Sequence, residues 1–226
     1  MAEKTVAARP RLTRERLLRA ALEYVDTHGL AALSMQKLGA ELGVKGMSLY
    51  SHVASKDALL DGIVEALWLE VRIPDTAGMD WSDALCSYGH SLRHLIGRHP
   101  AAASLLSRSF VPARALEEAD AYRQVLLRAG FGADQAVMAL RTVFAYARGY
   151  ALTEAAWRAA TPGEASDADD LVVLRRVSDM VAPNAPDHLL RFALEFCVNL
   201  QPDREFEFGL DLIVGGLGRW KDDDGS

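Results

Sequence analysis

Apolar residues recur every three or four positions along most of the chain, the spacing that places them on one face of an α-helix. No stretch alternates regularly between apolar and polar residues, as a half-buried β-strand would. The periodicity therefore predicts an all-α fold. Half of the 226 residues are hydrophobic, so the chain can bury a core as one large domain or as a small domain joined to a larger one.

Short helices are predicted at the N-terminal end, where polar residues suited to helix capping precede each apolar run. Thr13, Ser34 and Ser55 are the expected N-caps. Gly29 and Gly43 are expected to end the first two helices. The residues predicted to point inward are Leu17, Leu18, Ala21, Leu22, Val25, Met35, Leu38, Leu42, Leu49, Val53, Leu59, Ile63, Leu67 and Val71.

Longer helices are predicted after Pro74, which ends the helix that begins at Ser55. A stretch rich in acidic residues, 161–170, is expected to be a mobile loop, and a short helix can follow it. The remaining helices are expected at 80–97, 100–108, 113–129, 134–160, 186–198 and 203–220.

Composition argues against several protein classes. Two cysteines are too few for a disulfide framework, and no charge-free run approaches the roughly 18 apolar residues of a membrane span. The first residues are charged and lack the apolar core of a signal peptide. We therefore expect a soluble, cytoplasmic protein with no membrane partner.

Charge is distributed unevenly along the chain. Residues 1–60 carry nine Lys or Arg against six acids, a net charge of +3, whereas the remainder carries −9. A basic N-terminal segment on an acidic body suggests that this end meets a polyanion, although chance clustering on a solvated face gives the same pattern.

Residues 34–53, SMQKLGAELGVKGMSLYSHV, have the layout of a helix-turn-helix. Gly43 lies where the chain must reverse, and Gly39 is small enough for the two helices to approach closely. The second helix of the motif would expose hydrogen-bond donors, hydroxyls and an aromatic ring, as a helix in the major groove of DNA does. A purely structural helical hairpin has the same layout, so the pattern alone leaves both interpretations open.

Three stretches resemble the tetracycline-repressor (TetR) family. Residues from Arg16 to Val64 resemble its N-terminal domain, and Leu49 to Leu60 match the stretch L-Y-x-H-V-x-x-K-x-x-L-L. AGFGADQAVMALRTVFAYARGYALTEAAW and FEFGLDLIVGGL resemble the long core helix and the last helix of the tetracycline repressor. The resemblance implies an N-terminal three-helix helix-turn-helix DNA-binding domain and a C-terminal helical ligand-binding and dimerisation domain.

The resemblance also implies the domain boundaries and the DNA contacts. The expected parts are a flexible basic arm (1–12), the DNA-binding domain (13–57), the ligand-binding and dimerisation domain (58–220) and a disordered tail (221–226). Tyr50, His52 and Lys56 are expected to hold the DNA backbone. The full set of expected DNA contacts is Gln36, Lys45, Gly46, Met47, Ser48, Tyr50, Ser51, His52 and Lys56. Tetracycline-responsive members have Arg in place of Gln36 and Pro in place of Met47, so their operator sequence is not carried over.

The C-terminal part is expected to form a homodimer and an apolar effector pocket. The segment from Phe206 to Leu217 has more apolar surface than one solvated helix face, and its glycines suit close helix approach, although an intrachain core helix also fits. Aromatic residues such as Trp81 and Tyr150 are numerous enough to wall a pocket or to fill a core. The expected ligand contacts are Arg72, Tyr88, Leu92, Val137, Leu140 and Phe144.

Neither a metal site nor a catalytic site is expected. Cys86, His90 and His94 are spaced four residues apart, which separates the end members by about 12 Å along a helix, too far to share one ion. The metal-linked histidine of the tetracycline repressor has no counterpart here, because Ser107 falls near that position. The nucleotide-binding and zinc-protease motifs are also missing, so we expect no cofactor and no enzymatic activity.

The sequence therefore predicts a ligand-responsive transcriptional regulator, a repressor that a small apolar effector releases from palindromic double-stranded operator DNA. Two alternatives stay open: a helical small-molecule-binding protein without specific DNA recognition, and an activator of the same architecture.

Overall fold

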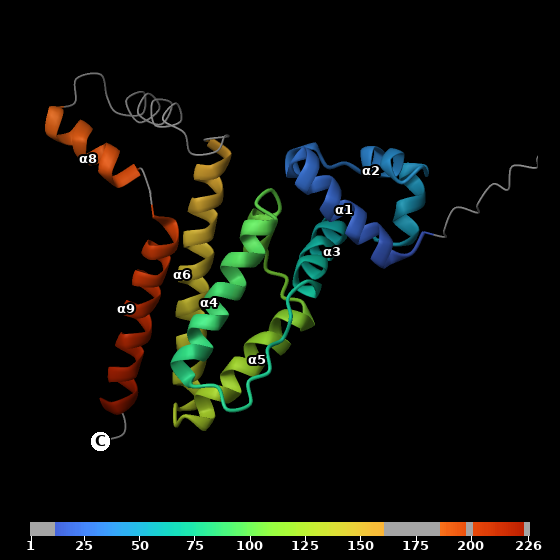
Figure 1. The fold of residues 1–226 in the computed structure, drawn as a ribbon. Helices are drawn as coiled ribbons and strands as arrows, with labels where there is room; N and C mark the ends of the chain where they lie inside the picture. The colour runs from blue at the N-terminus through green and yellow to red at the C-terminus, as the bar shows by residue number, and fades with distance from the viewer. Residues whose placement is uncertain (1–11, 161–185, 198–200, 224–226) are drawn as a thin grey trace, which may run out of the picture. The chain divides into compact units, whose positions relative to one another are not determined.

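The computed structural model describes residues 12–160, 186–197 and 201–223, and every regular element in these ranges is a helix (Figure 1). The all-α prediction is thereby confirmed. The chain divides into two compact units. The first holds the residues up to Pro74 together with His99–Glu118, and the second holds Asp75–Arg98 with the residues from Ala119 onward.

The first unit contains the helix-turn-helix segment. The hydroxyls of Thr13, Ser34 and Ser55 each accept a hydrogen bond from the backbone N–H three residues later, at 3.0–3.2 Å, so all three predicted N-caps are confirmed. The elements, with η denoting a 3₁₀-helix, are α1 (Arg14–His28), η1 (Leu30–Ala32), α2 (Met35–Glu41), η2 (Gly46–Ser51), α3 (Lys56–Leu69), η3 (Ala103–Ser107) and the first turns of α5 (Ala113–Arg128).

Two of the predicted helices are 3₁₀-helices. The element η2 replaces the third helix, and η3 replaces the helix expected at 100–108. Their backbone N–H groups bond three residues back, as from Ser48 N to Lys45 O (2.8 Å) and from Leu105 N to Ala102 O (2.9 Å). Runs this short gain few of the i to i−4 bonds that favour an α-helix, which accounts for the difference.

The core of the first unit lies between α1 and α3, which pack against each other. Its fully buried side chains are spaced along one face of each helix, as the periodicity predicts, and they include Leu17, Ala21, Val25, Leu59, Ile63 and Leu67.

The side chains of His99 and Arg108 connect the later segment of the first unit to α1, to α3 and to the residue that follows α3. His99 lies between two carboxylates, with Nδ1 2.7 Å from Asp26 Oδ2 and Nε2 3.0 Å from Glu70 Oε2. Arg108 Nε donates to Asp61 Oδ1 at 2.6 Å. The unit that contains the helix-turn-helix is therefore completed by a segment far along the chain.

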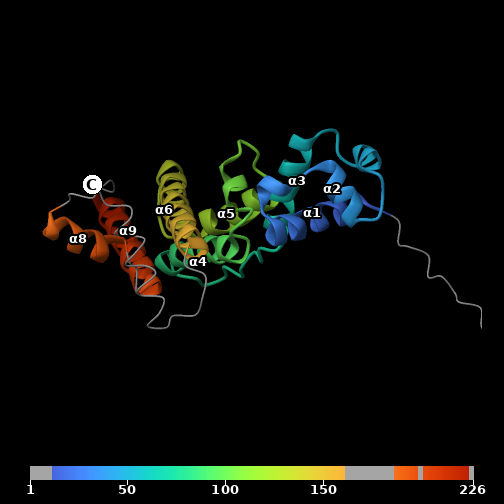
Figure 2. The ribbon, with the colours of Figure 1, turned by 90° about the horizontal axis from the view of Figure 1, so that it is seen from above.

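The second unit is a helical bundle in which α4 packs along α6 and α9 packs against both (Figure 2). On α9, Phe206, Leu210 and Val214 are buried, which places one face of this helix in the intrachain core. The helices are α4 (Trp81–Arg98), the last turns of α5, α6 (Ala133–Ala160), α8 (Asp187–Cys197) and α9 (Pro202–Asp223).

The helix bounds of the second unit lie within three residues of the predicted ones. The largest difference is at the end of α9, which continues to Asp223, so that the tail expected from residue 221 begins as helix. The Lys221 ammonium lies 5.7 Å from the centroid of the Phe131 ring, a cation–π contact that favours this extension.

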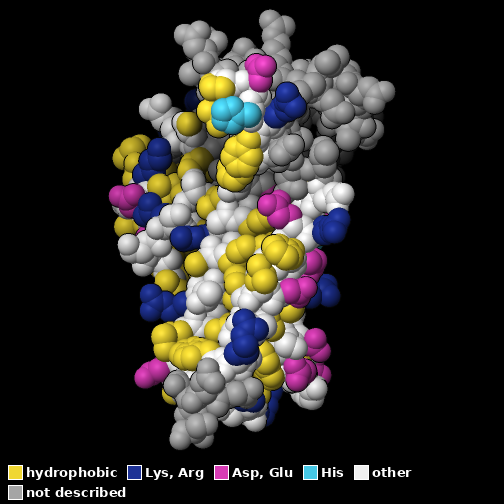
Figure 3. Space-filling model, turned by 90° about the vertical axis from the view of Figure 1, so that its left-hand side faces the viewer, with side chains coloured by type: hydrophobic (Ala, Val, Ile, Leu, Met, Phe, Trp, Pro, Cys, Tyr) yellow, Lys and Arg dark blue, Asp and Glu magenta, His cyan; other side chains and the backbone are white. Residues whose placement is uncertain are grey.

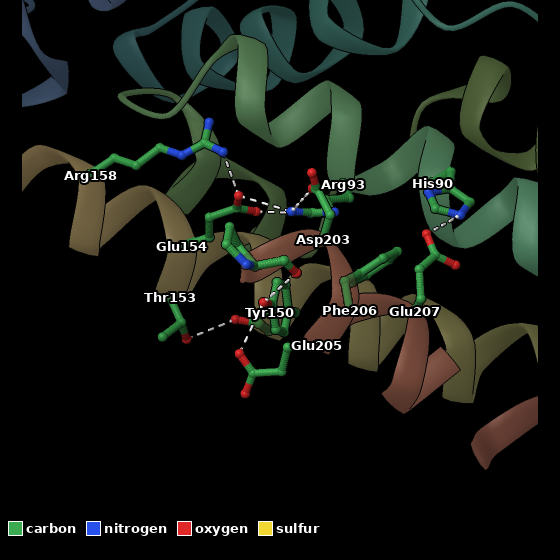
Figure 4. Close-up of polar contacts among 12 residues, drawn as sticks. His90, Arg93, Tyr150, Thr153, Glu154, Arg158, Asp203, Glu205, Phe206 and Glu207 are labelled. Atoms are coloured by element: carbon green, nitrogen blue, oxygen red, sulfur yellow. Dashed lines mark hydrogen bonds and ion pairs between the residues drawn. The ribbon is translucent and has the colours of Figure 1, made fainter. Parts of the chain in front are cut away.

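Arg93 joins the three main helices of the second unit (Figure 4). From α4, its Nε and Nη2 donate to the Glu154 carboxylate of α6, both at 2.9 Å, and Nη2 lies 2.8 Å from Asp203 Oδ1 of α9. Its guanidinium carbon lies 4.8 Å from the centroid of the Phe206 ring. The Arg93 and Glu154 side chains are only 14% and 10% exposed, so this ion pair is largely removed from water.

Several predictions fall outside the described residues or stay untested. Residues 1–11 of the predicted arm and the predicted loop at 161–170 lie outside them. The domain boundary expected at residue 57 falls near the start of α3, within the first compact unit. Compact units report packing, so the functional domain limits stay a prediction. None of the helices in the described ranges is long and apolar enough to cross a membrane.

Candidate nucleic-acid interface and effector site

The helix-turn-helix is held together by direct backbone contact between α2 and η2. A Cβ atom added at Gly39 would lie 2.8 Å from Gly46 N, and one added at Gly46 would lie 2.9 Å from Met35 O. Gly43 has a φ of 67°, which a glycine adopts without strain, and it makes the turn. Leu49 is fully buried and anchors η2 to the core.

The exposed side chains of this motif form what we call the recognition surface. It consists of the predicted DNA contacts that are exposed: Gln36 of α2, Lys45, Met47, Ser48, Tyr50 and Ser51 in and around η2, and Lys56 at the start of α3. His52 is half-buried at the end of η2. Gly46 differs from the other predicted contacts, because it packs against the backbone of α2 and sets the spacing of the two helices.

Lys56 is placed to meet an anion. It is the first residue of α3, and Ser55 caps that helix by accepting from Ala58 N at 3.0 Å. The N-terminus of an α-helix carries a partial positive charge, which a lysine reinforces. The neighbouring Asp57 carboxylate lies 3.6 Å from Arg108 Nη2, which offsets its negative charge. This end of α3 can therefore hold a phosphate of the DNA backbone.

The residues predicted to contact an effector are divided between the two units. Tyr88 and Leu92 on α4 and Leu140 on α6 are buried, and α4 and α6 pack against each other. Phe144 is half-buried and Val137 is exposed on α6. Arg72 is exposed and belongs to the first unit.

Aromatic residues of α6 fasten this helix to α9. Tyr146 Oη donates to Phe206 O at 2.9 Å, and Tyr150 Oη donates to Pro202 O at 2.7 Å. Burial raises the pKa of the Tyr146 phenol, and the Glu205 carboxylate raises it further, so the group stays protonated as a donor. Tyr150 therefore contributes to helix packing, one of the two roles that the sequence leaves open for it.

The possible metal ligands on α4 have other contacts. His90 Nε2 lies 3.1 Å from Glu207 Oε1, and the His90 ring packs edge-on against Phe206. Burial raises the pKa of the Cys86 thiol, as do the Asp211, Glu207 and Asp83 carboxylates in that order, which disfavours the thiolate that binds metals. No group of three or more potential ligands gathers within the part of the chain that the structure describes.

A surface groove lies between α1 and α3 in the first unit. Several of its charged groups pair with one another, Arg14 with Glu65 and Arg19 with Glu15. His99, at one end, occupies both of its ring nitrogens with carboxylates. Charged residues make up more than half of the lining of this groove, so it differs from the apolar effector pocket that the sequence predicts.

The His99 and Arg108 contacts are the part of this site that sequence reasoning missed. Their acidic partners lie 29 to 73 residues away along the chain, and no local pattern marks such pairs.

Two protein-family models match this chain. The model of the tetracyclin repressor-like C-terminal domain matches residues 73–220, and the model of bacterial regulatory proteins of the tetR family matches residues 17–63. The chain belongs to the TetR family.

Individual relatives agree with this assignment. An HTH-type transcriptional regulator of Saccharopolyspora erythraea is 36% identical over 157 residues, which are 69% of this chain and 66% of that protein. The class A tetracycline repressor of Escherichia coli is 34% identical over 205 residues, 90% of this chain and 89% of the repressor. The structure of the Streptomyces coelicolor TetR family protein ActR in complex with actinorhodin superposes with a TM-score of 0.74 at 25% sequence identity. The match covers 93% of this chain and 99% of the ActR chain.

The predicted fold and function class are thereby confirmed. This TetR-family chain is a ligand-responsive transcriptional regulator with an N-terminal helix-turn-helix domain and a C-terminal helical domain. The family consists of regulatory DNA-binding proteins.

Proposed function

We propose that the chain acts in the cytoplasm as a homodimeric repressor, which occupies a palindromic operator and leaves it when a small, largely apolar effector binds to the second unit. The observation that carries the proposal is the recognition surface, whose polar side chains project from a motif locked by the Gly39–Gly46 contact. A locked motif holds its side chains at fixed spacing, as matching to base edges requires.

The residues of the recognition surface divide by chemistry. Lys56 at the start of α3 and Tyr50 on η2 are suited to phosphates, which position the protein without reading sequence. The Gln36 amide can donate to and accept from a base edge, and Ser48 offers a hydroxyl. In the proposal, Lys45, Met47 and Ser51 also face bases and His52 supports the backbone contacts.

Dimerisation is supported by a second apolar face on α9. While Phe206 and Leu210 point into the core, Phe208 and Leu212 on the opposite side are 63% and 61% exposed. Viewed from the side of α9, hydrophobic side chains gather along this face (Figure 3). A surface of this kind is typical of an interface with a second copy, and a two-fold protein matches the symmetry of a palindromic operator.

The proposed effector site lies along the α4–α6 contact. Tyr88 packs against Tyr122 with ring centroids 5.1 Å apart, and the Tyr122 hydroxyl lies 3.0 Å from Ser87 Oγ. This arrangement supplies an apolar wall with a few polar groups, as small-molecule sites have. The other proposed contacts within the second unit are Leu92, Val137, Leu140 and Phe144. ActR was solved in complex with actinorhodin, which supports a small-molecule effector for this chain. We propose that no metal takes part.

Footprinting against genomic fragments, including the region upstream of the protein's own gene, tests this proposal. Protection of a palindrome is expected. Lys56→Ala should weaken binding to all sequences alike and lower the salt dependence, whereas Gln36→Ala should change which half-site is preferred. Arg158→Ala is the matched control, because it removes an exposed positive charge from the second unit and should leave binding unchanged.

Weak binding that is indifferent to sequence at physiological salt would instead favour a small-molecule-binding protein without specific DNA recognition. Increased transcription from the bound promoter would identify an activator.

A further inference from the structure

We propose that Met47 recognises the 5-methyl group of a thymine in each half-site of the operator. This inference rests on the proposed DNA binding and specifies the base chemistry of one position. The observation is that folding leaves the Met47 side chain 78% exposed on a surface whose neighbours are polar.

The exposure of Met47 follows from how η2 is held. The preceding Gly46 packs against the backbone of α2, where an added Cβ would lie 3.1 Å from Gln36 Cα. Ser48 N donates to Lys45 O at 2.8 Å, which fixes the backbone on both sides of Met47. The inward position of η2 is taken by Leu49, which is fully buried. Met47 therefore cannot turn into the core without disrupting η2.

An exposed apolar side chain at this position finds few apolar groups to contact on DNA. Phosphates and sugars are polar, and the base edges of the major groove present hydrogen-bond donors and acceptors. The exception is the thymine methyl group, which offers an apolar contact. Methionine suits such a contact because its unbranched thioether is flexible and polarisable.

The neighbouring side chains of Ser51 and Lys45 are suited to polar contacts rather than to a thymine methyl group. Ser51 Oγ donates to Ser48 O at 2.7 Å, so its proton is used within η2. Lys45, at the start of η2, is an exposed cation that prefers acceptors. The apolar contact and the polar contacts can therefore be made side by side.

Thymine-to-deoxyuridine replacement tests the inference. Once an operator has been footprinted or selected from random duplexes, each thymine in a half-site is replaced in turn by deoxyuridine, which removes the methyl group and keeps every hydrogen-bonding group. For one thymine we expect the dissociation constant to rise about fourfold when it is replaced in one half-site, and about 15-fold when it is replaced in both.

The Met47 variants connect the effect to this residue. Met47→Ala should bind the thymine and deoxyuridine operators equally, whereas Met47→Leu should retain a preference for thymine. Because the side chain is exposed, the melting temperature of Met47→Ala should match that of the unaltered protein, which excludes misfolding as the cause.

Three results would overturn the inference. Specific binding with no thymine that responds would show that Met47 contacts no methyl group. A deoxyuridine effect of the same size in Met47→Ala would assign the contact to another residue. Unchanged affinity of Met47→Ala for the operator would show that the Met47 side chain contributes nothing to DNA binding. If no sequence is enriched or protected at all, the proposed DNA recognition itself fails, which is a separate result.

Discussion

Replacing Arg93 by methionine tests whether the buried ion pair between α4 and α6 organises the second unit. The substitution keeps much of the side-chain volume and removes the guanidinium, which makes two 2.9 Å hydrogen bonds to Glu154. It leaves the Glu154 carboxylate, which is 10% exposed, and among the described residues Arg158, itself 64% exposed, remains as its ion-pair partner.

The expected loss follows from this burial. Removing one partner of a buried pair costs about 3–5 kcal/mol, and because Arg158 still meets Glu154 we expect the lower end, about 3 kcal/mol. For a chain of this length the melting temperature should fall by about 6–12 °C. Arg158→Met, the matched control, removes an exposed guanidinium from the same helix while Glu154 keeps its pair with Arg93, and it should cost about 0.5 kcal/mol.

A double-mutant cycle with Glu154→Met separates the pair from its surroundings. Replacing both charges by apolar side chains removes the uncompensated carboxylate, so the double variant should lie within about 1 kcal/mol of the unaltered protein. Thermal and urea unfolding followed by circular dichroism measure all four proteins. A loss below about 1 kcal/mol for Arg93→Met, or a double variant whose loss is the sum of the two single losses, would refute this reasoning.

Further predictions concern the motif, the interface and the thiol. Gly39→Ala should disrupt the contact of α2 with η2 and abolish DNA binding. Gly97→Ala, with open space around the added Cβ, should instead stabilise α4 slightly. Gel shifts and melting curves compare the two variants. Replacing Phe208 and Leu212 together by lysine should yield a folded monomer in sedimentation, and a persistent dimer would place the interface elsewhere. Because the pKa of Cys86 is raised, less thiolate is present at any given pH. In a variant with Cys197 replaced by serine, iodoacetamide should therefore modify Cys86 more slowly in the folded protein than in the unfolded protein, and equal rates at pH 8 would contradict the shift.

Local signals explain why much of the fold was predictable. Thr13, Ser34 and Ser55 lie just before apolar runs, and capping depends on residues only three positions apart. Gly43 was predictable as a turn for the same reason, since its positive φ is a local requirement. The type of short helix was harder to predict, because a single turn of α- and 3₁₀-helix have similar apolar spacing.

Contacts between distant segments could not be predicted in this way. The sequence leaves Tyr150 equally suited to a pocket wall and to a core, and its hydrogen bond to Pro202 depends on how α6 meets α9. His99 contacts Asp26 on α1 and Glu70, which directly follows α3. The role of Gly46 was likewise hidden, because a glycine in a recognition motif can approach DNA or the neighbouring helix, and the structure shows the second contact.

The central claim is that the recognition surface distinguishes one DNA sequence from others. Its most direct test is the ratio of affinities for the selected palindrome and for a scrambled duplex of the same composition, both measured at physiological salt. Specific DNA-binding proteins reach ratios of roughly 10³ or more, and we predict a ratio in that range for the unaltered protein. A ratio near one, with binding that disappears as salt is raised, would contradict this claim and show that the recognition surface binds DNA only through its positive charge.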